Sequence, residues 1–167
     1  MTLFIIDTDV VSELRKRSPH PHLLDWLKQT EPQQIGIPLS VIFEIQNGIE
    51  GLRTNGRAEK ADEIDAWLGR LLKLYGEHVI APNIDVARLQ ARMFSTPRLK
   101  NFLWPSPNST KPKFGIDLIV AATAIVCNGA VVTFNVKDYQ AVDKHFPLPG
   151  LFNPRDGEWV IPIKKAE

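Results

Sequence analysis

Four acidic residues lie at positions from which alternating strands and helices could bring them together. They are Asp7, Glu44, Asp117 and Asp138. Carboxylates that cluster repel one another and take up protons unless a cation neutralises them. Oxygen ligands favour Mg²⁺ or Mn²⁺ over zinc, and the histidines lack paired metal-ligand spacing. We therefore expect chemistry at a divalent cation held by carboxylates.

Other kinds of site are excluded by their missing motifs. The sequence contains no glycine-rich phosphate loop, no nucleophile elbow and no dinucleotide-binding fingerprint. The single cysteine, Cys127, lies in an apolar stretch and is expected to be a small core residue. One cysteine fits a reducing compartment, and the N-terminus lacks a secretory signal pattern. We therefore expect a cytoplasmic protein without a membrane segment.

Residues 114–139 contain the elements that must position two of these acids. Side chains 118–126 are apolar on nearly every face, which predicts a buried helix with Asp117 at its start. The Asn-Gly pair at 128–129 suits the C-terminal cap of that helix, and residues 130–134 resemble a strand buried on both faces. In such sheets the strand ends and the helix starts face one crevice, so both ends of this segment can meet.

The N-terminal segment predicts a second buried strand that ends in an acid. Residues 3–6 form a short apolar run before Asp7, and Thr8 or Asp9 can cap the helical turn that follows. A simple capping role for Asp7 is the alternative.

The remaining segments alternate between helix and strand patterns. Helical periodicity begins at Ser40 and places Glu44 beside its apolar face, four residues on, where a capping box would need three. Further helices are expected at 19–28, 57–75 and 84–94, with strands at 34–39 and 78–81. This alternation predicts an α/β fold, a sandwich with a mainly parallel central sheet.

Length and composition predict one compact domain. With 167 residues and 44% hydrophobic content, the chain can bury roughly two thirds of its unfolded surface. The formal net charge is +1, so any nucleic-acid contact must be local. We expect the domain to span residues 1–154, followed by a tail at 155–167. Residues 159–163 of the tail form either an edge strand or a partner-binding segment.

Residues 95–113 interrupt the pattern with four prolines and no acidic residue, so we expect a loop rather than a helix. Its cations and aromatic residues match the composition of a nucleic-acid contact, in which cations meet phosphates and rings stack on bases. The candidate RNA-binding residues are Arg98, Lys100, Trp104, Lys111 and Lys113. A surface lid anchored by its aromatic residues is the alternative.

Four stretches resemble the PIN domain, most closely the VapC and FitB group of toxin nucleases from bacterial toxin-antitoxin pairs. They are IIDTDVVSELRK, SVIFEIQNGIEGL, FGIDLIVAATAIV and VVTFNVKDY, in the family's order and approximate spacing. The resemblance covers about residues 3–154. It implies a PIN-like three-layer α/β/α sandwich and Mg²⁺-dependent endoribonuclease activity. It also implies silencing by a cognate antitoxin and often a homodimer.

The resemblance also assigns roles to individual acids. It places Asp7, Glu44 and Asp117 at the three acidic positions that hold metal. One or two ions there would polarise the scissile phosphate and lower the pKa of an attacking water. The carboxylates would orient both, and no side chain need attack.

The last motif supplies further candidates, and the sequence departs from the family at Asp9, at Phe134 and in the connection 95–113, which is longer than usual. Asn135 falls where many members have a fourth acid or an asparagine. Asp138 follows it, and Thr133 matches a small hydroxyl residue that supports the site. Asp9 stands where the family usually has asparagine, and is expected to support the site. Phe134 replaces a residue that is often arginine in the most similar members.

Two rival functions use the same residues. The stretch FIIDTDVV also resembles the opening of haloacid-dehalogenase phosphatases, with Asp7 as nucleophile and Asp9 as acid and base. The later lysine and the paired acids of that family do not follow at the expected places. The other rival is a catalytically weak PIN-like module that binds RNA or protein, because Asn135 replaces an acid.

Overall fold

The chain folds around a six-stranded sheet that is parallel except at one edge, in the order β3-β2-β1-β4-β5-β6. The computed structural model describes residues 1–104 and 113–163. The strands are β1 (Phe4–Ile6), β2 (Ile35–Pro38), β3 (Val79–Ile80), β4 (Ala130–Val132), β5 (Leu151–Asn153) and β6 (Glu158–Ile161).

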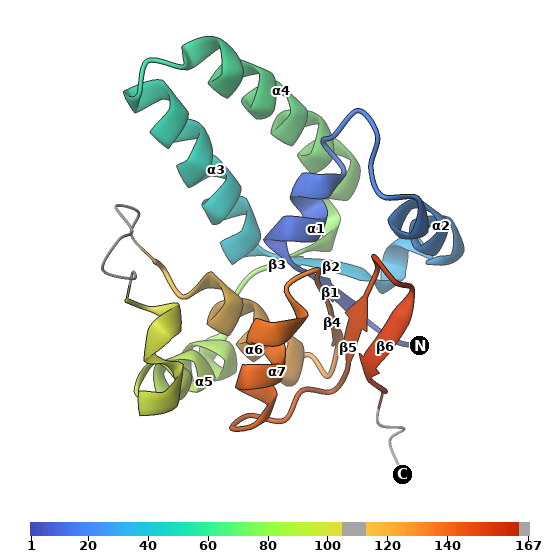
Figure 1. Cartoon of the computed structure of the whole chain (residues 1–167), viewed down its shortest axis with the longest axis vertical. Coiled ribbons are helices and arrows are strands. Elements are labelled where there is room, and N and C mark those ends of the chain that lie inside the picture. The colour runs from blue at the N-terminus through green and yellow to red at the C-terminus, as the bar shows by residue number, and fades with distance from the viewer. Residues whose placement is uncertain (105–112, 164–167) are drawn as a thin grey trace.

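Helices cover both faces of this sheet, which confirms the predicted α/β/α layers (Figure 1). Helices α5, α6 and α7 lie on one side, α1 and α2 on the other, and α3 and α4 form a projecting hairpin. The helices are α1 (Thr8–Glu13), α2 (Pro21–Gln29), α3 (Leu39–Thr54), α4 (Ala58–Tyr75), α5 (Ile84–Phe94), α6 (Ile116–Val126) and α7 (Val136–Asp143). Short 3₁₀ helices are η1 (Pro32–Gln34), η2 (Gly76–His78) and η3 (Pro97–Phe102).

The centre of the sheet is formed by β1 and β4, whose residues are all buried. Ile5 of β1 lies opposite Gly36 of β2 and Val131 of β4. A side chain at position 36 would approach Ile80 of β3 to 2.5 Å, so glycine lets the strands pack closely. The apolar runs that predicted β1 and β4 thus form the two central strands, which are covered on both faces.

Helix α6 is packed into the core, and both of its ends are fixed by backbone geometry. At its C-terminus Asn128 adopts a left-handed φ of 50°, and the Gly129 amide donates to the Ala124 carbonyl at 2.8 Å. This Schellman arrangement confirms the predicted cap. At its N-terminus Gly115 has a φ of 63°, and a Cβ there would lie 2.7 Å from Leu103. Glycine is favoured at this position because a side chain would be strained there, and its absence lets the start of α6 pack against the segment after η3.

Several local predictions are corrected. The helix after β1 is capped by Asp7 rather than by Thr8 or Asp9. Part of the expected loop at 95–113 is the 3₁₀ helix η3, and residues 105–112 lie outside the described residues. Helix α7 and strand β5 were not predicted.

The open question about the end of the chain is answered by β6, which pairs antiparallel with β5 as an edge strand. This strand lies within the segment expected to be a tail. In the described part of the chain, no helix combines the length and apolarity needed to cross a membrane.

Candidate active site

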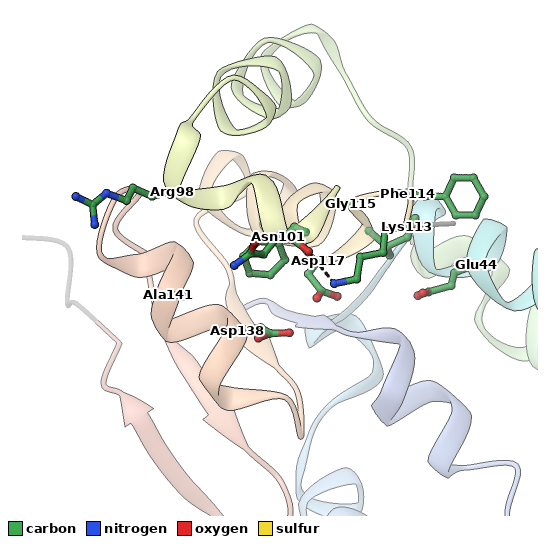
Figure 2. Close-up of a pocket in the computed structure, with 11 residues that line it drawn as sticks. Glu44, Arg98, Asn101, Lys113, Phe114, Gly115, Asp117, Asp138 and Ala141 are labelled. Carbon is green, nitrogen blue, oxygen red and sulfur yellow. Dashed lines mark hydrogen bonds between the residues drawn. The ribbon is translucent and has the colours of Figure 1, made fainter. Parts of the chain in front are cut away.

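Acidic side chains from several elements gather at the carboxyl edge of β1 and β4. Asp117 lies in the first turn of α6 and Asp138 in the first turn of α7, while Glu44 extends from α3. These three acids line a pocket of about 260 Å³. Figure 2 shows their carboxylates on different sides of this pocket, with Asp117 between Glu44 and Asp138. The convergence predicted from the sequence therefore occurs for these residues.

Asp7 lies deeper than the other acids, with 3% of its surface exposed. Its Oδ1 accepts a hydrogen bond from the Thr8 amide at 2.8 Å, which caps α1. Its Oδ2 accepts a hydrogen bond from the Thr133 hydroxyl at 2.8 Å. Asp7 is thus both a helix cap and a member of the acidic cluster, so the two alternatives raised by the sequence are compatible.

Thr133 and Asp9 tie the end of β4 to the start of α1. The Thr133 Oγ1 accepts a hydrogen bond from the Asn135 amide at 2.9 Å, and the Asp9 Oδ2 accepts one from the Phe134 amide at 3.0 Å. The Thr133 hydroxyl has one proton, and its shortest acceptor is Asp7 rather than the Asp9 oxygens at 3.2 and 3.4 Å. Thr133 thus orients the Asp7 carboxylate and the Asn135 amide, and Asp9 orients the Phe134 amide.

Asn135 fixes the last acid of the cluster. Its side-chain amide donates to the Asp138 Oδ2 at 2.7 Å, and Asn135 itself is exposed at the N-terminus of α7. The amide therefore orients Asp138 without adding negative charge. A carboxylate at position 135 could not donate this hydrogen bond.

The carboxylates change one another's proton affinity. Burial, followed by the charges of Asp138 and Glu44, raises the pKa of Asp117 to about 7, while Lys113 acts in the opposite direction. Burial, followed by the charges of Asp9 and Asp117, raises the pKa of Asp7 well above its ordinary value. Burial also raises the pKa of Asp9, although hydrogen bonds from Phe134 and Thr133 oppose the shift. The site is therefore short of positive charge.

The chemistry of this donor set fits a hard divalent cation. The acids offer only oxygen ligands, and a cation would offset the burial and the repulsion that raise the pKa values of Asp7 and Asp117. Within residues 1–104 and 113–163, however, no group of three or more His, Cys, Asp or Glu side chains is already placed to hold a metal ion. The acids supply suitable ligands around a pocket and do not form a finished cage.

Two of the cations predicted from residues 95–113 line the pocket, namely Arg98 and Lys113. The Lys113 Nζ donates to the Asn101 carbonyl at 2.7 Å, and its side chain extends toward Asp117 (Figure 2). The Arg98 guanidinium points away from the carboxylates, at the rim. Lys113 therefore places a positive charge beside Asp117, and Arg98 places one at the rim of the pocket.

The other predicted RNA-binding residues lie elsewhere. Lys100 and Trp104 do not line the pocket, and the Trp104 side chain is 70% exposed. Lys111 lies outside the described residues. In their place the pocket lining includes Asn101 and Phe102. Their position in η3, next to Arg98, was hidden because proline-rich composition predicted a loop.

Sequence reasoning also missed Tyr139, which follows Asp138 on α7. Its side chain is completely buried, and its hydroxyl lies near the Asp7 carboxylate but outside regular hydrogen-bond geometry. Burial, followed by the charge of Asp7, raises the pKa of this phenol well above its ordinary value. The hydroxyl is thus held neutral behind the acidic cluster. Recognition of a helix at 136–143 would have placed Tyr139 on its buried face.

Comparison with known proteins agrees with the observed architecture. No protein-family model matches the sequence, and no curated protein matches it. In structure, the chain resembles one of FitAcB from Neisseria gonorrhoeae, with a TM-score of 0.67 and 21% identity, covering 91% of this chain and 98% of that one. It also resembles a chain of DNA-bound VapBC2 from Rickettsia felis, with a TM-score of 0.63 and 18% identity, covering 91% of this chain and 98% of that one.

A third similar structure is DNA-bound VapBC from Salmonella typhimurium, with a TM-score of 0.60 and 15% identity, covering 92% of this chain and 99% of that one. At these identities the likeness establishes the fold. The chain therefore has the PIN-like fold present in these VapBC and FitAB assemblies, as the sequence motifs predicted.

Proposed function

We propose that this protein is a Mg²⁺-dependent endoribonuclease and the toxin of a toxin-antitoxin pair. The observation that carries the proposal is the gathering of Glu44, Asp117 and Asp138 around one pocket, with Asp7 beneath them, in this fold. The similar structures include complexes named VapBC and FitAB, and another is a toxin-antitoxin complex from Klebsiella pneumoniae.

The site residues divide into ligands, orienting groups and phosphate contacts. Asp7, Glu44 and Asp117 would hold the cation, and Mn²⁺ would substitute for Mg²⁺. A bound ion would supply Lewis-acid polarisation of the scissile phosphate and lower the pKa of an attacking water. Thr133 orients Asp7, and Asn135 orients Asp138 toward the pocket. Lys113 beside the acids and Arg98 at the rim of the pocket would neutralise substrate phosphates.

An antitoxin partner is part of the proposal, and the same comparison and the shape of the surface support it. A hollow of about 300 Å³ lies between α1 and the α3-α4 hairpin, and Glu44 forms part of its lining. A segment of another protein bound there would reach the edge of the acidic pocket. The homodimer stays a prediction, which light scattering on the purified chain would test.

The proposal is tested with protein purified free of antitoxin. The parent should cleave one or more members of a broad RNA panel with Mg²⁺ or Mn²⁺, and EDTA should abolish cleavage. Asp117→Asn provides the matched inactive control. A parent that cleaves no RNA with either ion would contradict the nuclease assignment.

A binding module without catalysis is the second candidate, and one observation favours it. Among the described residues, no three potential ligands already form a metal cage. Such a module would bind RNA equally well with EDTA and with Mg²⁺, whereas a nuclease would show cation-dependent cleavage. The same RNA panel therefore separates the two functions.

A further inference from the structure

A separate hollow lies beside Asn135, whose side chain contacts the acidic pocket through Asp138. Its volume is about 490 Å³, and it is bordered by Asp9, Phe134 and Asn135. The remaining charged lining consists of three cations, Arg15, Lys16 and Arg155, and one further acid, Glu13. Because Asn135 donates to Asp138, which lines the acidic pocket, a single hydrogen bond of 2.7 Å separates the two hollows.

Arg155 is the most distinctive side chain of this second hollow. Its guanidinium carbon lies 5.1 Å from the centre of the Phe134 ring, in a cation-π contact. Stacking uses the flat face of a guanidinium and leaves the N–H groups at its edge free to bind an oxyanion. Within the described residues, neither Arg155 nor Arg15 takes part in an ion pair, whereas Lys16 pairs with Glu13.

The backbone that carries Arg155 is held in place on several sides. It lies in the turn between β5 and β6, where the Arg155 amide donates to the Asn153 side chain at 3.0 Å. The His22 ring bonds the Arg155 carbonyl at 2.7 Å, which joins the turn to α2 (Figure 1). Gly157, with a φ of 71°, donates to the Asn153 carbonyl at 3.0 Å. A charge on a fixed turn loses less entropy on binding than one on a free chain.

The charges of the whole site form a consistent pattern. The acidic cluster has Lys113 and Arg98 on the side of η3, and Arg155 and Arg15 on the side of the β5-β6 turn. A small anion would need only one of these groups. A polyanionic strand has a charge at every phosphate, so it can contact both groups while one phosphodiester lies at the carboxylates.

We propose that Arg155, held on the ring of Phe134, binds a backbone phosphate of single-stranded RNA beside the acidic site, on the side of the β5-β6 turn. The inference rests on the proposed function, because it assigns a substrate contact to the same site. Arg155 is a positioning residue. It fixes where the strand lies, and it does not touch the reacting phosphate.

The test measures RNA binding rather than cleavage. A labelled single-stranded RNA is titrated at several KCl concentrations against protein carrying Asp117→Asn, which prevents cleavage. Arg155→Ala should reduce the salt slope by roughly 0.7, the value for one neutralised phosphate on a single strand. Its affinity at low salt should fall several-fold. Arg70→Ala, which removes an exposed arginine of α4 outside both hollows, should leave the slope unchanged.

Two further variants separate charge from packing. Arg155→Lys keeps the charge but lacks the planar edge, so it should retain the slope and lose part of the affinity. Arg155→Ala combined with Phe134→Arg returns a guanidinium to the same place and should restore the slope. Circular dichroism and denaturant unfolding show that each variant is folded.

The outcomes distinguish this inference from the proposed function. If the parent cleaves RNA but Arg155→Ala has the parental slope, only the inference is wrong. If the slope depends on Arg155 but the parent, with Asp117 intact, cleaves no RNA, only the nuclease proposal is wrong. A folded parent that does not bind single-stranded RNA at all overturns both.

Discussion

Thr133 donates its hydroxyl proton to the Oδ2 of Asp7 at 2.8 Å, across a separation of 126 residues. The Thr133 Oγ1 also accepts a hydrogen bond from the Asn135 amide, which begins the segment leading to Asp138. One fully buried hydroxyl therefore positions the carboxylate after β1 and the polar residues after β4. This contact depends on the parallel pairing of β1 with β4, which brings their carboxyl ends together.

The first prediction concerns this hydroxyl. Thr133→Val keeps the shape but removes the donor to Asp7 and the acceptor of the Asn135 amide. Leaving a buried polar group unpaired costs about 1 to 3 kcal/mol, so we expect lower stability and weaker Mn²⁺ binding. Thr133→Ser keeps the hydroxyl and is the matched control. Calorimetry of Mn²⁺ binding and denaturant unfolding measure both effects, and equal cation affinity in the two variants would contradict the role of Thr133.

The second prediction concerns Asp117. Asp117→Asn should remove most of the cation affinity while the chain stays folded, because amide and carboxylate have similar shape and different charge. Titration with Mn²⁺ followed by calorimetry measures the loss, and circular dichroism checks the fold. Unchanged cleavage and unchanged Mn²⁺ binding by this variant would remove Asp117 from the site.

The third prediction is a pH dependence of stability without metal. Asp117 has a pKa of about 7 in the folded protein and an ordinary value of 3.8. Between pH 3.8 and about 7, Asp117 is therefore protonated in the folded state and ionised in the unfolded state. This contribution favours folding at low pH and is lost as pH rises through about 7. For each difference of one between the folded and unfolded pKa values of a group, the free energy of unfolding changes by about 1.4 kcal/mol across the titration.

Denaturant unfolding at pH 5.5 and at pH 8 tests this expectation in buffer containing EDTA. The metal-free parent should lose stability at the higher pH, and Asp117→Asn should lose less. Mg²⁺ should oppose the loss, because it favours the ionised carboxylates. A parent and a variant with the same pH dependence would show that Asp117 does not titrate as described.

The fourth prediction separates the cations that line the pocket from those that do not. In the Asp117→Asn background, the double replacement of Arg98 and Lys113 by alanine should reduce the salt slope of RNA binding by roughly 1.4, for two phosphates. The double replacement of Lys100 and Arg88, both exposed and outside the pocket, is the control. Equal salt slopes in the two variants would indicate that residues 95–113 form a structural lid and do not contact RNA.

The fifth prediction decides the role of Asp9. Its carboxylate accepts the Phe134 amide, and the oxygen of an asparagine can accept the same hydrogen bond. Asp9→Asn should therefore retain most RNA cleavage. Hydrolysis of p-nitrophenyl phosphate by the parent, lost in Asp9→Asn while RNA cleavage is unchanged, would support the phosphatase rival.

Apolar patterning along the chain was enough to predict the buried elements and the acids at their ends. Continuous apolar runs predicted β1, β4 and α6, because residues covered on all sides must be apolar. The Asn-Gly pair predicted the end of α6, because a left-handed residue there satisfies the last carbonyls. The gathering of the acids followed from the rule that strand ends in such a sheet share one edge.

Local sequence patterns did not predict the elements that are short or polar. Strand β5 has three residues, and α7 has eight with only two buried, so neither shows a clear period. The proline content of residues 95–113 predicted a loop, but proline is tolerated at the first turn of a helix, and Pro97 lies at the start of η3. The residues missed at the site, among them Asn101 and Tyr139, lie on η3 and α7.

Which polar groups meet depends on contacts between elements that are distant in the sequence. Thr133 bonds Asp7 because β1 and β4 are neighbours in parallel register, and Arg155 stacks on Phe134 because the β5-β6 turn lies beside the end of β4. Periodicity reports which face of an element is buried, but it carries no information on the order and register of strands distant in sequence. Those are determined by packing of the whole chain, and they convert separate acids and cations into one site.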